Sequence, residues 1–433
     1  MKEIAIGSRL ELFVDRYLLD RVRGVSLRMH RPQPFPLARC PIRGGYLTII
    51  KDGDLYRAYY RGNDPHYLGD EFDGNPGEIT RYAQSRDGHE WTFPELGLFE
   101  IDGSKKNNVI LAGQAPCSHN FSPFVDACPD KDDRERFKAL SGTHPGGGLY
   151  AHTSADGVHW QKMQDAPVMT SKDFAFDSQN TSFWSEAEKC YVCFFRTWNT
   201  PHGELRTFSK STSPDFIHWN RPKPIVSNLP GEHLYTSQAH PYFRAPHLYV
   251  ALPTRFAPLR GDSTEILFMT SRSGARFARP FREAFIRPGM DPARWGNRAN
   301  YAGLGVVPTC PGEMSIYHAG SGHRYTLRTD GFVSVNAPHK GGELITKPLI
   351  FEGRQLVLNL STSATGSVQV EIQRADRMPV PGFALEECPA IVGDQIEHVV
   401  SWWCGADVSS LAGTPVRLRF LMKDCDLYSL QFC

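Results

Sequence analysis

A short turn motif recurs along the chain and constrains the fold more than any other feature of the sequence. Its copies combine Ser with Asp or Gly and a nearby aromatic residue, and they begin at Ser85, Ser154, Ser213 and Ser271, with a degenerate fifth copy at Arg328. Asp-Gly between strand-forming residues is a strong hairpin signal, because glycine takes the positive φ that such a turn needs. The copies recur at intervals of roughly 57 to 69 residues, which fits one four-stranded blade with its loops. The repeat therefore predicts a five-bladed β-propeller.

The composition favours short strands and argues against several classes of protein. The chain has 433 residues, a formal net charge of +1 and no basic run, so binding to nucleic acid or to a membrane surface has no support. Its 38 glycines and 32 prolines favour tight turns over long helices. No apolar run approaches the roughly 18 residues of a membrane span, and residues 1–4 do not begin a signal peptide. The location stays open between the cytoplasm and a periplasm reached by way of a removed leader.

A change of pattern near residue 338 predicts a second domain. The turn motif stops there, and alternating apolar and polar residues follow in 356–360, 368–372 and 416–420. Such segments are typical of a β-sandwich with a core of its own. We therefore predict an all-β chain, with the five-bladed β-propeller over 1–337, including N-terminal strands in 1–45, and a C-terminal β-sandwich over 338–433. Residues 1–45 could pair with either domain.

Motifs for cofactors and for nucleophilic catalysis are absent from the sequence. Cys190 and Cys193 have the spacing of metal ligands, but no second Cys or His pair accompanies them, so buried free thiols are the better interpretation. The sequence contains no Gly-rich phosphate loop, no Gly-x-Ser-x-Gly and no His-Glu-x-x-His. We predict reduced cysteines and no cofactor or metal, and no motif supports a structural calcium.

The order of predicted strands sorts the acidic residues between the two mouths of the propeller. The first strand of each blade lines the central channel, and its start opens on the same face as the loop between strands two and three. Asp177 and Glu232 fall at first-strand starts, and Asp262 falls in such a loop. Asp126 and Glu313 fall at the opposite mouth.

Carboxylates that converge at one mouth are what the cleavage of a glycosidic bond needs. One carboxyl protonates the leaving oxygen, and the other attacks the sugar carbon or activates water. We therefore predict Asp177 and Glu232 as the catalytic pair, with Asp262 orienting them or modulating their pKa. In the structural alternative, Asp177 caps a turn and Glu232 lies in a solvated loop.

Other polar residues on the same predicted face form a candidate substrate-binding set. These residues are His119, Asn120, Gln179, Asn180, Arg196, His240, Arg255 and Arg298. Arginine binds carboxylate or sulfate in a bidentate manner, so the set favours an anionic sugar such as a uronate or a sulfated residue. The alternative is that these arginines pair with acids around the channel. Trp184, Trp198 and Tyr235 could stack on a sugar or pack between blades.

Several segments carry a resemblance to known proteins. They are Leu12-Phe13-Val14-Asp15, His119 to Phe124, Phe176 to Asn180, Glu232 to Thr236 and Arg244 to His247. Together with the turn motifs, five blades and a following sandwich, the chain resembles the invertase and arabinanase clans of glycoside hydrolases. These segments are similar to planctomycete-type invertase-like proteins over nearly the whole chain. The resemblance implies a carbohydrate-active propeller. The invertase motifs Trp-Met-Asn-Asp-Pro-Asn-Gly and Arg-Asp-Pro are absent, and Glu387-Cys388-Pro389 lies in the predicted sandwich, so catalytic residues of those clans do not transfer.

Three functions remain open from the sequence. The leading hypothesis is a glycoside hydrolase that acts on an oligosaccharide or polysaccharide of plant or algal origin. The second is a carbohydrate-binding protein without catalysis. The third is a glycan lyase or phosphorylase on the same scaffold, in which a lyase would use a His or Tyr base beside an arginine-bound uronate. Sugar identity, linkage, stereochemical outcome and oligomeric state are left open, because the separation of two carboxylates cannot be read from a sequence.

Overall fold

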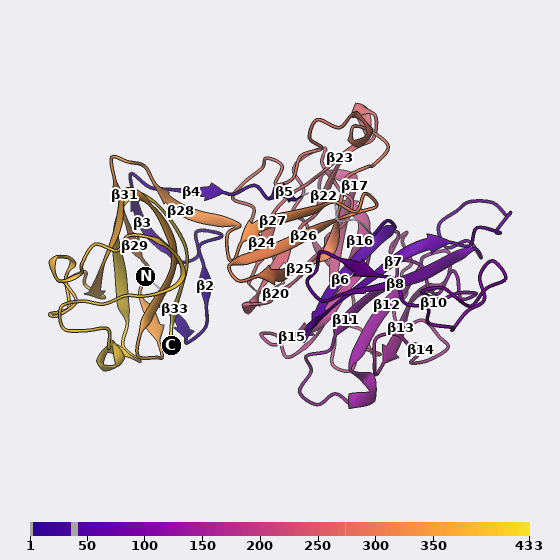
Figure 1. The fold of residues 1–433 in the computed structure, drawn as a ribbon, viewed down its shortest axis with the longest axis horizontal. Helices are drawn as coiled ribbons and strands as arrows, with labels where there is room; N and C mark the ends of the chain where they lie inside the picture. Colours follow the sequence, from indigo (N-terminus) through magenta and orange to yellow (C-terminus); the bar gives the residue numbers. More distant parts are fainter. Residues whose placement is uncertain (1–2, 36–41, 273) are drawn as a thin grey trace. The chain divides into compact units, whose positions relative to one another are not determined.

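The computed structural model describes residues 3–35, 42–272 and 274–433, and within these the protein is almost entirely strand and turn (Figure 1). Its helical segments are 3-10 turns of three residues each: η1 (Asp133–Glu135), η2 (Pro258–Arg260), η3 (Pro292–Arg294), η4 (Leu385–Glu387) and η5 (Ser409–Leu411). The all-β prediction is therefore confirmed. None of these described helical turns is long and apolar enough to cross a membrane. The chain divides into two compact units, one of residues 1–31 with 327–433 and one of residues 32–326.

The unit of residues 32–326 contains the first four turn motifs and is built from five sheets. One sheet has nine strands: β5 (Gln33–Phe35), β6 (Gly45–Asp52), β7 (Leu55–Asn63), β8 (Glu78–Ser85), β9 (Trp91–Thr92), β10 (Val109–Leu111), β25 (Tyr301–Cys310), β26 (Glu313–Ala319) and β27 (Arg324–Arg328). Two sheets have four strands: β11 (Ser122–Val125), β12 (Phe137–Thr143), β13 (Gly148–Ser154) and β14 (Gln161–Lys162), and then β15 (Thr181–Ser185), β16 (Cys190–Thr200), β17 (Gly203–Ser213) and β18 (Lys223–Ile225). Two have three strands: β19 (His233–Leu234), β22 (Thr254–Ala257) and β23 (Ser263–Ile266), and then β20 (His240–Tyr242), β21 (Ala245–Ala251) and β24 (Met269–Ser271).

These sheets correspond to the predicted blades with three differences. The predicted second and third blades are the two four-stranded antiparallel sheets. The predicted first and fifth blades are joined into the nine-stranded sheet by a parallel pairing of β6 with β25, where Leu304 lies opposite Thr48. The predicted fourth blade is divided between the two three-stranded sheets. Strand β5, from the N-terminal residues 1–45, pairs with β27 at the edge of the nine-stranded sheet.

Each turn motif is held by its own side chains. Asp156 Oδ1 accepts hydrogen bonds from the backbone N–H groups of Val158 and His159, both at 2.9 Å, and Ser154 Oγ accepts from the N–H of Gly157 at 2.9 Å. Burial alone raises the pKa of Asp156, but these donors outweigh burial and hold the pKa well below its ordinary value. The motif aspartates therefore serve the turn, as predicted.

Two of the turn motifs pack against strands that are distant from them in sequence. The hydroxyl of Tyr59 on β7 donates to the carbonyl of Gly157 at 2.9 Å, and a Cβ on Gly157 would lie 2.7 Å from that hydroxyl. Tyr317 on β26 makes the same contact with the carbonyl of Gly88, at 2.6 Å. Only glycine fits such a close approach with a positive φ, which is 76° at Gly157. The motif therefore joins strands that are distant in sequence as well as turning the chain.

The other unit is one ten-stranded hydrogen-bonded sheet with its own core. Its strands are β1 (Ile4–Gly7), β2 (Glu11–Leu12), β3 (Leu19–Arg23), β4 (Ser26–Met29), β28 (Val333–Ala337), β29 (Gly342–Thr346), β30 (Leu349–Phe351), β31 (Leu356–Arg374), β32 (Asp394–Val399) and β33 (Val416–Phe432). Alternate residues of the long pair β31 and β33 point inward, and Leu358, Val370 and Phe420 are fully buried. This alternation follows from the two-residue period of a strand.

The N-terminal strands pair within this second unit, which differs from the predicted division at residue 337. Strand β4 pairs with β28, β3 with β29 and β1 with β30, so the indigo strands lie among the orange and yellow ones in Figure 1. Phe13 and Leu18, both buried, belong to the same core as Phe420. The buried apolar residues of the N-terminal segment therefore complete the sheet that the C-terminal strands begin. The degenerate fifth turn motif also lies here, with Asp330 buried against Asn359 and Ser429.

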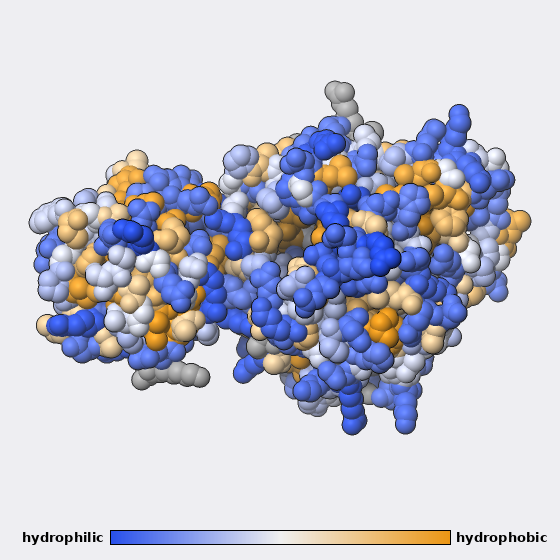
Figure 2. All heavy atoms as spheres, turned by 90° about the horizontal axis from the view of Figure 1, so that it is seen from below, coloured by the Kyte–Doolittle hydropathy of each residue, from blue (hydrophilic) through white to orange (hydrophobic). Residues whose placement is uncertain are grey.

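The face drawn in Figure 2 mixes hydrophilic and hydrophobic residues. The most exposed apolar side chains of the described residues include Leu259, in η2, and Met290 and Trp295, which flank η3. Isolated exposed apolar residues are ordinary for a globular protein.

Candidate functional site

A cavity of about 550 Å³ lies in the unit of residues 32–326. Among the residues that line it are three tyrosines, three arginines and two aspartates: Tyr46, Tyr235, Tyr301, Arg61, Arg294, Arg298, Asp73 and Asp291. Gln238 and the start of β25 complete part of the wall. The volume suits a small ligand, and the lining combines flat aromatic faces with charged groups that can orient one.

Strained backbone gathers around this cavity. Five non-glycine residues have a positive φ at or just before the first strand of a predicted blade: Tyr46 (47°), Asn120 (54°), Phe176 (66°), Gln238 (47°) and Arg298 (55°). Three of these five line the cavity. Such residues cost free energy and persist only where the surrounding structure holds them, which is common at functional sites.

A chain of amides connects four of the predicted first-strand segments. Gln179 Nε2 donates to Thr48 Oγ1 at 2.7 Å, and Gln238 Nε2 donates to Gln179 Oε1 and to the carbonyl of Ala302, both at 2.7 Å. Asn180 donates to the carbonyls of its own loop. Gln179 and Asn180 were predicted to bind substrate, but these hydrogen bonds instead hold together the backbone segments around the cavity.

His240 extends this frame and is held as a neutral ring. Its Nδ1 donates to the carbonyl of Gln238 at 3.0 Å, and its Nε2 accepts from the backbone N–H of Val306 at 3.0 Å. Burial lowers the pKa of His240 to about 4. Both ring nitrogens are occupied by the backbone, so His240 positions two strands instead of contacting a ligand.

His119 and Asn120 reach the cavity through Arg61. Arg61 Nη1 donates to Asn120 Oδ1 at 3.1 Å, and its guanidinium lies over the Tyr46 ring, 4.9 Å from the centroid. His119 Nδ1 lies 2.7 Å from Glu78 Oε2, which is 3.8 Å from Arg61 Nη1. The two predicted residues thus fix the arginine that lines the cavity.

Asp177 forms an ion pair with Arg196, two of the residues predicted for the site. The carboxylate contacts Arg196 Nη2, and the Asp177 side chain remains 25% exposed while that of Arg196 is 2% exposed. Asp177 is not among the residues that line the described cavity. The next residue, Ser178, donates from Oγ to the carbonyl of Tyr235 at 3.1 Å, so the Asp177 loop contacts the chain at a cavity residue.

Glu232 is held by two arginines in a buried cluster. Arg279 donates to both carboxylate oxygens, at 2.6 and 2.8 Å, and Arg255 Nη1 lies 3.3 Å from Glu232 Oε1. Burial raises the pKa of Glu232, but the Arg279 contacts, the backbone N–H of Leu229 and the charge of Arg255 outweigh it and hold the pKa below its ordinary value. A general acid needs the opposite shift.

Asp262 and Arg298 form a second pair beside the cavity. Arg298 Nη2 lies 3.3 Å from Asp262 Oδ2, and both side chains are partly exposed. Arg298 lines the cavity, while Asp262 is not among its lining residues. The three predicted catalytic acids are therefore each paired with arginine, and none of the three lines the described cavity.

Tyr235 is the residue on which the arginines converge. The Arg196 and Arg206 guanidiniums lie 4.6 and 5.0 Å from its ring centroid, and the charge of Arg298 also acts on its phenol. The Tyr301 ring lies 5.5 Å away, nearly perpendicular. Sequence reasoning proposed Tyr235 only as a stacking surface and missed Arg61, Arg206, Tyr46 and Tyr301. These residues lie on or beside different strands, and no motif in the sequence connects them.

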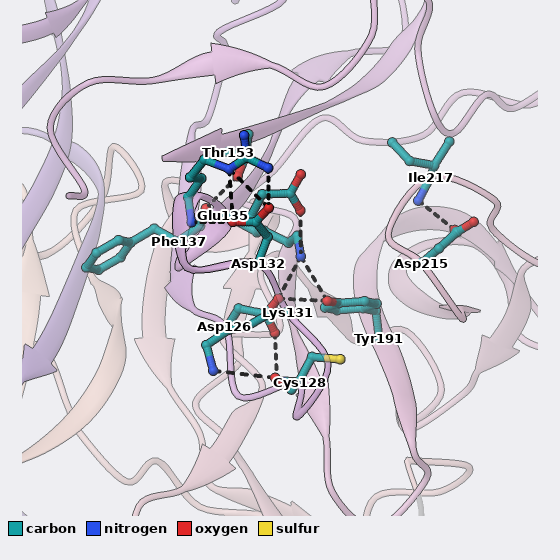
Figure 3. Close-up of polar contacts among 12 residues, drawn as sticks. Asp126, Cys128, Lys131, Asp132, Glu135, Phe137, Thr153, Tyr191, Asp215 and Ile217 are labelled. Atoms are coloured by element: carbon teal, nitrogen blue, oxygen red, sulfur yellow. Dashed lines mark hydrogen bonds and ion pairs between the residues drawn. The ribbon is translucent and has the colours of Figure 1, made fainter. Parts of the chain in front are cut away.

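A buried polar cluster surrounds Asp126, which was predicted to lie away from the substrate site. Asp126 Oδ2 accepts from Lys138 Nζ at 2.7 Å and from the Tyr191 hydroxyl at 2.7 Å, and its Oδ1 accepts from the N–H of Cys128 at 2.9 Å (Figure 3). Asp126 and Lys138 are almost fully buried. Every contact of this carboxylate is internal, so the cluster stabilises the fold.

A third group contains possible metal ligands. His89, Cys310 and Glu313 have ligand atoms within 4.8 Å of one another. Arg324 Nη1 lies 2.7 Å from His89 Nε2, and Arg324 Nη2 lies 3.3 Å from Glu313 Oε1. A guanidinium in contact with two of the three groups opposes a cation there. Nine cysteines are free thiols in the structure, with Cys193 buried, and Cys40 lies outside the described residues.

Comparison with known proteins gives similarity in structure alone. No family model and no curated protein sequence matches the chain. A thermostable family-43 glycoside hydrolase is 12% identical with a TM-score of 0.47, covering 71% of this chain and 96% of its own. An endo-arabinase from Bacteroides thetaiotaomicron is 10% identical with a TM-score of 0.41, covering 68% and 96%. An N-acetylgalactosamine deacetylase from F. plautii, solved with blood group B trisaccharide, is 12% identical with a TM-score of 0.45, covering 94% and 95%. Glycoside hydrolases are thus among the structures that this chain resembles, and the planctomycete-type similarity stays a prediction.

Proposed function

We propose that the protein is a glycoside hydrolase that binds an anionic glycan in the cavity between Tyr46, Tyr235 and Tyr301. The single observation that carries this proposal is the lining of the cavity, in which three tyrosines and three arginines surround a space of about 550 Å³. Aromatic faces bind the apolar faces of sugar rings, and guanidiniums bind carboxylate or sulfate groups. This combination matches a uronic or sulfated sugar better than a neutral one.

We further propose that the five sheets of this unit together form the five predicted blades of one propeller. The cavity would then lie at one mouth of that propeller. The support is the packing of two of the turns on strands that are distant in sequence. The turn before β9, in the first predicted blade, contacts β26 of the fifth, and the turn before β14, in the second, contacts β7 of the first. These contacts therefore also link the last predicted blade to the first. The parallel pairing of β6 with β25 relates the same two groups. The second unit, with its own core, fits the proposed β-sandwich.

Among the predicted acids, we propose Asp177 as the carboxylate that acts on the substrate. Its side chain is one-quarter exposed, and its partner Arg196 also contacts the Tyr235 ring. An arginine partner favours the ionised form, which suits a nucleophile or a base that activates water. Glu232 we propose as a structural member of the arginine cluster, and Asp262 as the residue that orients Arg298.

The test is a product-resolved screen of the full chain against neutral, uronic and sulfated oligosaccharides. Wild type should cleave anionic substrates with addition of water, and Asp177→Asn should lose most of that activity. Asp165→Asn is the matched control, because Asp165 is exposed and far from the cavity lining. Binding without cleavage of any substrate would overturn the hydrolase proposal in favour of a carbohydrate-binding protein. A product with an unsaturated, ultraviolet-absorbing end would overturn it in favour of a lyase.

A further inference from the structure

Tyr235 is fixed in the cavity wall by its backbone. Its N–H donates to the carbonyl of Thr254 at 2.7 Å, and its carbonyl accepts from Ser178 Oγ at 3.1 Å. The side chain is 7% exposed and yet lines the cavity. The phenol is therefore presented to a ligand from a rigid support, with little of its ring open to solvent.

Three arginines from separate elements place their positive charge beside the phenol of Tyr235. Arg196 comes from β16, Arg206 from β17 and Arg298 from the turn before β25. Arg196 and Arg298 are balanced by Asp177 and Asp262, whereas Arg206 has no carboxylate partner among the described residues. At least one guanidinium beside Tyr235 is thus left without a compensating anion.

The buried arginines have unused hydrogen-bonding capacity. Arg196 Nε and Nη1 and Arg206 Nε are buried without a hydrogen-bond partner among the described residues. Neither arginine is among the residues that line the cavity, so a ligand anion in the cavity meets Tyr235 and Arg298 before it meets them. The positive charge of Arg196 and Arg206 therefore stabilises the phenolate form of Tyr235 instead of binding an anionic ligand directly.

The remaining groups that face Tyr235 are Tyr46 from β6 and Tyr301 from β25. Burial raises the pKa of all three phenols. At Tyr235 the charges of Arg196, Arg298 and Arg206 outweigh burial and lower the pKa, whereas at Tyr46 and Tyr301 the pKa remains raised. Of these three phenols, Tyr235 is the one that gives up its proton most readily.

We propose that Tyr235 is a catalytic residue that donates a proton to the leaving oxygen of the glycan. The inference rests on the hydrolase function proposed above and supplies the acid that Glu232, bound to two arginines, is poorly suited to be. As the sugar C–O bond breaks, its electron pair goes to the leaving oxygen, which takes the phenolic proton. The guanidiniums neutralise the phenolate. Water then adds its hydroxyl to the sugar carbon, and its proton passes through Asp177 back to Tyr235, so one water is consumed per bond.

The first test follows the phenol without any substrate. The absorbance of phenolate near 295 nm is titrated for the folded full chain and for Tyr235→Phe, which keeps the ring and removes the hydroxyl. The difference between the two should contain one phenolate that forms below the ordinary tyrosine pKa of about 10. Arg206→Gln should move this titration to higher pH, and Arg206→Lys, which keeps the charge, should largely restore it. A phenol that titrates at or above the ordinary value would overturn the proposal.

The second test measures catalysis on a substrate from the oligosaccharide screen. Tyr235→Phe should lower kcat by about 10²- to 10⁴-fold, the usual contribution of a general acid, with a much smaller change in KM. Tyr67→Phe is the control, since the Tyr67 hydroxyl makes only a long, exposed contact with the carbonyl of Asp70. In wild type, kcat should fall as pH rises through the Tyr235 titration, and Arg206→Gln should shift that limb upward.

The two proposals fail in different ways. If Asp177→Asn abolishes cleavage and Tyr235→Phe keeps its kcat, the hydrolase stands and the role of Tyr235 is overturned. If wild type cleaves none of the glycans, the hydrolase function is overturned and the proton-donor role with it. An early phenolate together with a large loss of kcat supports both.

Discussion

The neutral state of His240 predicts a specific loss of stability in acid. In the folded protein its Nε2 accepts a hydrogen bond from Val306, so protonation would break that contact. Burial lowers the pKa of His240 from 6.5 to about 4. Between these two values the unfolded chain binds a proton at this histidine and the folded chain does not. The free energy of unfolding therefore falls as pH drops from 6.5 toward 4, and the loss ends once both states are protonated.

The size of this effect follows from the shift. A difference of one pKa unit corresponds to about 1.4 kcal/mol, so the change from 6.5 to about 4 is worth about 3 kcal/mol. This is a large fraction of the stability of an ordinary domain. Because His152 and His318 also have lowered pKa values, about 4 and about 3, the whole protein should lose more than His240 alone accounts for.

The measurement compares wild type with His240→Gln by urea unfolding at several pH values between 8 and 4. At pH 8 the variant should be less stable, since it lacks the bridge between Gln238 and Val306. The difference between the two proteins should then shrink by about 3 kcal/mol as pH falls to 4, because only wild type has the proton-linked loss at this site. His202→Gln is the control, as His202 is exposed. A difference that stays constant with pH would refute the reasoning.

Three further outcomes follow from contacts elsewhere in the protein. Asp126→Asn removes the buried counter-ion of Lys138 and leaves it only the exposed Glu135, 3.3 Å from Nζ, so urea unfolding should show a loss of about 3 kcal/mol, and a loss below 1 kcal/mol would mean that the pair is not desolvated. Gly157→Ala adds both strain and a clash with a tyrosine hydroxyl, so it should lower the melting temperature clearly more than Gly97→Ala, which has a similar φ of 72° but nothing within 4 Å; equal effects would contradict the close approach. Glu232→Gln should destabilise the fold by roughly 3 kcal/mol, because the buried Arg279 loses its charge partner while Arg255 keeps Glu265, and a fully stable but inactive variant would return Glu232 to the catalytic role.

The sequence predicts the turns and strands of this fold well, because the contacts that hold them are formed by residues close together in the chain. The turn at Ser154, Asp156 and Gly157 is held by contacts within a few residues, so its pattern is visible in the chain. The alternation in 356–360 and 416–420 likewise marks strands with one buried face. Secondary structure and the repeat are therefore within reach of sequence reasoning.

The partners of charged side chains are not visible in the same way. Glu232 has the position of a channel acid, but Arg279, which fixes its charge, lies 47 residues away. Arg206 and Arg196 meet at Tyr235 only because three different segments converge there. The sequence predicted where acids would lie, while the partners that decide their protonation depend on the tertiary structure.

The chain leaves one compact unit at residue 31 and returns to it at residue 327, so the unit of residues 32–326 is an insertion between two halves of its neighbour. During synthesis the strands β1 to β4 emerge first and must wait for β28 to β33, nearly 300 residues later, before they find their partners. Closing so long a loop is slow, whereas the inserted unit is continuous and can complete its sheets first. We therefore expect the inserted unit to fold first. Its two ends then bring together the two halves of the other unit. A truncation at residue 337 would separate strands that belong to one sheet. Removal of residues 32–326 would instead cut the chain at the boundaries between the two units.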